Sequence, residues 1–175
     1  MNKIAEKIRL FNAYVGSVDS ANKLVGITDE VTLPDFEMMS ETLSLAGLPG
    51  EIDSPSTGQF KSAQVEITFS NISEEALRLA ADDSKALILR GAQEQLEKES
   101  YGRSTIGRAL TIKGLTKGIN FGKLKKGGYG NPSIKKEVLY YQDKVGETVI
   151  TEVDKLNAKY VVNGVDMMAD VADLI

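Results

Sequence analysis

The chain has 175 residues, enough for one domain, and its 42% hydrophobic and 26% charged residues are close to globular averages. It contains no cysteine and no histidine, which excludes disulfides, thiolate or imidazole metal sites and histidine-dependent catalytic triads. No apolar run is long enough to span a membrane, and the N-terminal residues do not resemble a secretory signal. We therefore expect one soluble domain over residues 1–175, made in the cytoplasm.

The net charge of −4 is unevenly distributed along the chain. Residues 19–53 contain eight acidic residues and one basic residue, whereas residues 103–144 contain ten basic residues and two acidic ones. Chance clustering on solvated faces is one interpretation. The other is head-to-tail contact between copies, because an isologous dimer would place each patch against itself.

The N-terminal half predicts short strands at residues 11–15, 23–33 and 36–45, with Pro34 interrupting the ladder. The stretch "AGLPGEIDSPSTGQF", residues 46–60, has two prolines and several glycines, so we expect neither helix nor strand there. Residues 63–70 follow with a strict alternation of apolar and polar side chains, which predicts a strand with one buried face. The long loop would then lie at the tip of a hairpin.

The next segment changes period and predicts a helix of about three turns. Ser73 is a favourable N-cap, and two glutamates follow it in the first turn. Leu77, Ala80 and Ala81 share one face, which we expect to pack on a sheet.

The remainder predicts strands at residues 85–99, 104–118, 133–144, 147–157 and 160–162, with a flexible loop at 123–132. The tail resumes helical spacing, with Met168, Val171, Ala172 and Ile175 on one face. The predicted fold class is mainly β: an antiparallel β-sandwich or barrel with one flanking α-helix and a short C-terminal helix.

No catalytic, cofactor-binding or metal site is predicted, and we do not expect an enzyme. Glu97 and Glu99 lie two residues apart on a strand, as solvated carboxylates commonly do. The loop lysines Lys123, Lys125 and Lys126 lie beside glycines that could cradle a phosphate, but a basic interface loop is the favoured interpretation. A sequence pI near 5.0 and the absence of tryptophan argue against tight nucleic-acid binding.

Several stretches in their order resemble the major tail tube proteins of contractile-tailed bacteriophages. These are "GITDEVTLPDFEMMSETLSLAGLPGEID", the segment from "ILRGAQEQLEKESYGRSTIGRALTIKG" to "LTKGINFGKLKKGG", "LYYQ" and "NAKYVVNGVDMMADVADLI". The resemblance covers residues 11–175, except for the loop after Asp53. Its motifs are Leu33-Pro34, Gly47-Leu48-Pro49-Gly50, Tyr140-Tyr141 and Asn163-Gly164-Val165-Asp166.

The resemblance implies a structural subunit of the tail-tube type, with no cofactor, that forms hexameric rings. The rings would stack head to tail into a hollow conduit inside a contractile sheath. The implied partners are further copies of the chain, the sheath protein, and baseplate and tail-terminator proteins. DNA would pass through the lumen without specific binding, and no membrane partner is implied. The protein would be located in the virion tail after assembly in the host cytoplasm. The inner tube of an R-type bacteriocin, or of another contractile injection system, is the alternative within this class.

Two groups of residues receive predicted roles on this basis. The loop at the hairpin tip would contact the next ring and face the basic loop, since their charges are opposite. A polar strand face would line the lumen, where neutral or acidic side chains avoid binding DNA. The predicted inter-ring residues are Gly47, Leu48, Pro49, Gly50, Glu51, Asp53 and Pro55, with Lys123, Lys125 and Lys126 as the complementary loop. The candidate lumen residues are Gln64, Glu66, Thr68, Gln93, Gln95 and Glu97.

Functions of another class remain alternatives. The first is a monomeric β-barrel that binds a small ligand or a carbohydrate, although carbohydrate modules usually present tryptophan platforms. The second is a hydrolase on a β-scaffold, which the missing histidine and cysteine weaken. Electron microscopy separates these alternatives, because only a tube subunit would form rings or tubes.

Overall fold

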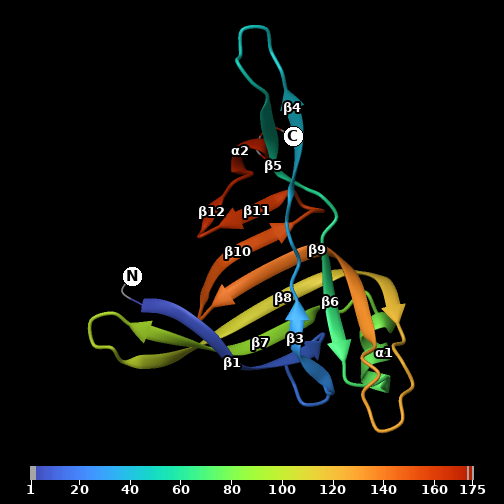
Figure 1. Ribbon diagram of the computed structural model, residues 1–175. Coiled ribbons are helices and arrows are strands. Elements are labelled where there is room, and N and C mark those ends of the chain that lie inside the picture. The colour runs from blue at the N-terminus through green and yellow to red at the C-terminus, as the bar shows by residue number, and fades with distance from the viewer. Residues whose placement is uncertain (1–2, 173, 175) are drawn as a thin grey trace.

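The computed structural model describes residues 3–172 and 174 and confirms a mainly β, antiparallel fold with two small helices (Figure 1). The strands are β1 (Lys3–Val15), β2 (Lys23–Leu24), β3 (Ile27–Thr32), β4 (Met38–Leu43), β5 (Ile52–Phe60), β6 (Gln64–Phe69), β7 (Leu87–Glu97), β8 (Arg103–Asn120), β9 (Ser133–Val145), β10 (Thr148–Asp154), β11 (Lys159–Val162) and β12 (Val165–Asp166). The helices are α1 (Glu74–Ala81) and α2 (Ala169–Ala172).

The main sheet runs in the order β2–β1–β7–β8–β9 and divides at β9. One edge of β9 pairs with β6 through residues 133–137 and with β10 through residues 140–145. The first branch continues to β3, and the second continues through β11 to β12. Because β3 follows β2 after only two residues, the first branch curls back toward the start of the sheet and forms a barrel-like unit.

The division of the sheet coincides with irregularities in β8. Its register against β9 shifts between Lys113 and Gly114 and again between Thr116 and Gly118. Such bulges bend a strand and increase its local twist. A Cβ atom at Gly114 would overlap the backbone carbonyl oxygen of Glu137, so the two strands approach more closely there than any other residue allows.

The core fills the inside of the curled sheet. The predicted alternation in β6 is confirmed, since Ala63, Val65, Ile67 and Phe69 are all buried. They pack with side chains from the opposite strands and with α1. The largest fully buried side chains are Phe69, Ile67, Leu79, Leu87, Ile112, Val65, Val138 and Val153.

Helix α1 begins where the sequence predicts but is two turns long and turns a different face to the core. The Ser73 side chain accepts a hydrogen bond of 3.2 Å from the backbone amide of Ala76. Ala76 and Leu79 are buried, whereas Leu77, on the predicted face, is 40% exposed. The prediction of that face was only partly right: Ala80 packs partly buried against the core, but contacts with the sheet select the overlapping apolar stripe that contains Leu79.

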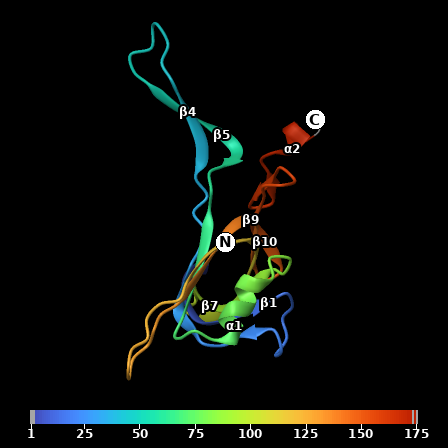
Figure 2. The ribbon, with the colours of Figure 1, turned by 90° about the vertical axis from the view of Figure 1, so that its right-hand side faces the viewer.

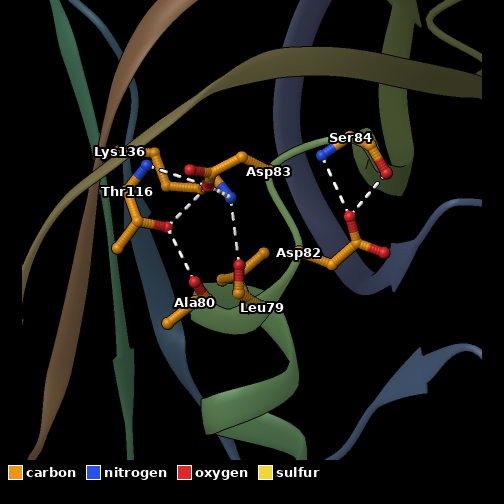
Figure 3. Close-up of polar contacts among 7 residues, drawn as sticks. All are labelled: Leu79, Ala80, Asp82, Asp83, Ser84, Thr116 and Lys136. Carbon is orange, nitrogen blue, oxygen red and sulfur yellow. Dashed lines mark hydrogen bonds and ion pairs between the residues drawn. The ribbon is translucent and has the colours of Figure 1, made fainter.

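A buried lysine of β9 fixes the C-terminal end of α1 (Figure 3). Lys136 is only 3% exposed, and its Nζ donates to the Leu79 carbonyl at 3.0 Å and to Asp83 Oδ1 at 2.9 Å. The single hydroxyl hydrogen of Thr116 of β8 is shared between the Ala80 carbonyl, 3.1 Å from Oγ1, and Asp83 Oδ1, 2.7 Å from it. Two carbonyls that the helix end leaves without intrahelical partners are thereby satisfied by the sheet.

The N-terminal strands differ from the predicted ones. β1 starts at Lys3, because residues 3–10 pair with the distal part of β7, with register shifts around Ile8 that account for their irregular polarity pattern. The predicted strand at 23–33 is two strands, since Gly26 has a φ of +84° that breaks the ladder. At the C-terminus α2 is a single turn, and Ile175 of the predicted apolar face lies outside the described residues.

Candidate assembly surfaces

The most prominent feature is a two-stranded arm, β4–β5, that projects from one end of the molecule (Figures 1 and 2). It forms its own sheet. The prediction that residues 46–60 are neither helix nor strand was wrong, because residues 52–60 form β5. Backbone pairing of Leu43 with Ile52 and of Ser40 with Pro55 overrides the weak strand propensity of the segment. Pro55 is tolerated because β5 pairs on one side only.

The predicted inter-ring residues divide between the tip and one strand of the arm. Gly47, Leu48, Pro49, Gly50 and Glu51 form the turn, whereas Asp53 and Pro55 lie in β5. All are exposed, and Asp53 Oδ1 accepts a hydrogen bond of 2.9 Å from Thr42 across the arm. The arm also exposes apolar side chains that the prediction did not single out. These are Met39, Leu43, Leu45 and Ile52.

An aromatic cluster attaches the base of the arm to the main sheet. Phe60 stacks edge-on with Phe36, at a centroid distance of 5.5 Å, and with Tyr160 of β11, at 5.0 Å. Phe36 in turn meets Tyr141 of β9 at 5.4 Å. Each such pair contributes about 0.5–1.5 kcal/mol beyond area burial. Burial, aided by Asp143, raises the pKa of Tyr141 to about 12, so its ring stays neutral in this cluster.

Two further contacts support the arm base. Gly58 lies against Met168, close enough that a Cβ atom at this position would overlap the thioether. Lys155 donates from Nζ to the Lys61 carbonyl at 3.1 Å, just after β5 ends. The base of the arm is therefore in contact with the C-terminal segment at Met168 and with Lys155. In the sequence, only the aromatic residues Phe36 and Phe60 could have indicated how the arm is attached to the main sheet. Their partners could not be identified, because they lie on strands far along the chain.

The basic loop between β8 and β9 lies at the end of the molecule opposite the arm (Figures 1 and 2). Its neck is closed by a 3.0 Å hydrogen bond from the Lys123 amide to the Gly130 carbonyl. The side chains of Lys123, Lys125 and Lys126 are exposed and form no ion pair with a described residue. Phe121, Leu124 and Tyr129 are exposed beside them, so the loop is both basic and apolar.

The candidate lumen residues form two separate groups. Gln64, Glu66 and Thr68 lie on the face of β6 that points away from the core, where Glu66 accepts from Ser133 at 2.7 Å and lies 3.6 Å from Lys135. The second group lies on β7, which does not pair with β6. In that group Gln93 is 7% exposed and donates to the Glu6 carbonyl at 3.4 Å, and Gln95 and Glu97 are half-buried.

Glu137 of β9, which lies beside β6, has several hydrogen-bond and ion-pair partners. Burial of its carboxyl favours the neutral acid, but hydrogen bonds from Ser62 and Ala63 and the charge of Lys155 outweigh it and lower the pKa. Its Oε2 lies 2.6 Å from Ser62 Oγ and 3.6 Å from Lys117 Nζ. The charges on this part of the surface are therefore largely paired within the subunit.

Within residues 3–172 and 174, no group of histidine, cysteine or acidic residues is arranged to hold a metal ion. A search of the same residues finds no helix with the length and apolar character needed to cross a membrane.

A comparison with family models identifies the family of the chain. The model of the family "phage tail tube protein FII" matches residues 5–175, which is nearly the whole chain. No curated protein matches the chain.

Proposed function

The chain belongs to the phage tail tube protein FII family, and we propose that its copies form hexameric rings that stack head to tail into the conduit of a contractile tail. The family makes it a structural component of a phage tail tube. The hexameric state, the surrounding sheath and the passage of DNA are the proposed part. An R-type bacteriocin tube would use the same subunit contacts.

The observation that carries the stacking proposal is the position of the two charged extensions. The arm contains Glu41, Glu51 and Asp53 and no basic residue between its first and last strand residues, whereas the opposite loop contains three lysines. Because these surfaces differ and lie at opposite ends, contact between them is heterologous and continues from copy to copy. Opposite charges would also orient approaching copies.

Electron microscopy of the purified protein tests this proposal, with rings or tubes as the expected result. In a matched variant residues 44–51 are replaced by Asn-Gly, which closes the Leu43–Ile52 pair with a two-residue turn and keeps both arm strands. This variant should keep its fold and lose tubes. Normal tubes from the variant would show that the arm tip does not join the rings, and a protein that stays a monomer even when a tail baseplate is supplied would contradict the function.

The lumen wall is proposed on one of two rows of side chains. One is the outer face of β6, with Gln64, Glu66 and Thr68; the other is the row of Gln93, Gln95 and Glu97 on β7, which continues the face of the buried Leu87 and Leu89. Glu66→Lys and Glu97→Lys, made separately, place a cation on each candidate row. A cation on the lumen wall would bind phosphates and slow DNA ejection, whereas one elsewhere would leave ejection unchanged. Ejection kinetics of particles that carry each variant therefore identify the row that faces the DNA.

A further inference from the structure

A groove of about 760 Å³ lies between β1 and β3. β1 pairs with β7 along its length, but its other edge pairs with β2 only at Ala13 and Tyr14. β3 pairs with β6 alone among the described strands. Among the described residues β1 and β3 do not pair, and only the short β2, joined to β3 by Val25 and Gly26, lies between them, so the barrel-like unit is incomplete at this place.

The lining of the groove is mainly apolar. Leu89 and Leu110 form its floor, and Ile8, Leu10 and Val25 stand exposed along its margin. The charge at its base is already compensated, because Arg108 donates from Nε to Asp143 Oδ1 at 3.1 Å and Asp143 is buried. The groove therefore exposes a continuous apolar surface that water covers poorly.

We propose that this groove receives the tip of the β4–β5 arm of a second copy. The proposal rests on the proposed stacking and names the surface that accepts the arm. The apolar side chains of the tip, Leu45, Leu48 and Ile52, would cover the groove floor. A volume of this size, within the range of about 300–1,000 Å³ typical of ligand pockets, accommodates several aliphatic side chains.

The arm itself supports this choice of occupant. A lone two-stranded hairpin is marginally stable in water, and both faces of the arm tip are exposed. The arm rises from one end of the molecule, whereas β1 and β3 lie toward the other end, so a chain does not fill its own groove (Figures 1 and 2). The tip and the groove thus lack partners within one copy and complement each other between copies.

Charge sets the orientation of the inserted arm. The β1 side of the groove carries Lys23 of β2, which forms no ion pair with a described residue, and Arg9 of β1, which already lies 3.5 Å from Glu94. The β3 side carries Asp29 and Glu30. Of the carboxylates of the arm, Glu41 in β4 would therefore lie toward β1 and away from β3, and Glu51 and Asp53 remain available to the basic loop.

Cysteine cross-linking tests the proposal directly, because the natural chain contains no cysteine. Leu48→Cys places a thiol on the arm tip, and Val25→Cys places one at the groove margin, where the native side chain is 63% exposed. The two variant chains, one with a size tag, are mixed, allowed to assemble and oxidised. A disulfide requires Cα atoms within about 7 Å, so it reports close contact.

The matched control pairs Leu48→Cys with Leu156→Cys, a 75% exposed position between β10 and β11. We expect several-fold more mixed disulfide with Val25→Cys than with Leu156→Cys. If electron microscopy of the same samples shows tubes but the two pairs cross-link equally or not at all, the groove assignment is wrong and the stacking stands. If the samples contain neither assemblies nor cross-links, both proposals fail.

Discussion

The Nζ atom of Lys136 lies 2.9 Å from Oδ1 of Asp83, and the lysine is buried whereas the aspartate side chain is partly open to water. Because only the lysine is buried, removing one residue of the pair should affect stability differently from removing the other. Without Asp83 a buried ammonium group keeps only the Leu79 carbonyl and loses its counter-charge, whereas without Lys136 the carboxylate can be hydrated.

We therefore expect Asp83→Asn to lower the free energy of unfolding by about 2 kcal/mol, and Lys136→Met to lower it by only about 1 kcal/mol, because the Leu79 carbonyl then loses its donor. Urea unfolding of both variants measures the difference. If Lys136→Met destabilises the protein more than Asp83→Asn does, the attraction of the lysine charge contributes more to this contact than the cost of burying that charge.

The same pair predicts a dependence of stability on pH. The hydrogen bonds from Lys136 and then Thr116 lower the pKa of Asp83 below its ordinary value of 3.8. A carboxyl group whose pKa is lowered by folding stabilises the protein above the unfolded value and loses that contribution as the pH falls through the folded value. The loss of stability caused by Asp83→Asn should thus have its full value near neutral pH and become smaller below pH 3.8. Unfolding curves across the acid range check this, and a constant difference would contradict it.

The close approach of β8 and β9 predicts an unusually sensitive glycine. Alanine at Gly114 would overlap the Glu137 carbonyl oxygen, so one of the strands must move where the sheet divides. We expect Gly114→Ala to cost more than about 4 kcal/mol, which places it among the exceptional substitutions. Gly107→Ala is the control in the same strand, because nothing lies within 4 Å of its added carbon. Equal thermal stabilities of the two variants would refute this explanation.

The arm base provides a second steric prediction. Gly58 has a φ of +76°, and an added Cβ atom would overlap the Met168 thioether. Gly58→Ala should destabilise the arm base by at least about 1 kcal/mol, through both strain and overlap. Adding the substitution Met168→Ala should recover only the stability that was lost to the steric overlap. Hydrogen exchange of the β5 amides measures both effects. If the second substitution recovers no stability, the whole destabilisation comes from backbone strain and the overlap contributes nothing.

The opposite charges of the arm and the basic loop predict a reciprocal exchange. Replacing Glu51 and Asp53 by lysine should prevent assembly, because like charges then meet between copies. Replacing Lys123, Lys125 and Lys126 by glutamate should do the same. A chain with both sets of changes should assemble again, as counted by electron microscopy. If the combined chain assembles no better than either parent, the two surfaces do not meet.

Local pattern was sufficient wherever a segment depends on its own neighbours. The alternation from Ala63 to Phe69 predicted β6 and its buried face, because a strand places successive side chains on opposite sides. Ser73 predicted the start of α1, because capping is a contact within one turn. The ordered motifs also carried the family resemblance, which the match over residues 5–175 confirmed.

Contacts between distant residues decided the rest. The proline-containing segment from Ile52 to Phe60 is a strand only because β4 pairs with it and because Phe60 stacks on rings from Phe36 and Tyr160. The C-terminal end of α1 is fixed by Lys136 and Thr116, which lie far along the chain. The groove between β1 and β3 exists because the curled sheet stops short of closing. The periodicity of a sequence shows which side of a helix or strand is apolar. Which strands pair, in which register, and which strand edges stay open are decided by long-range packing that no local pattern encodes.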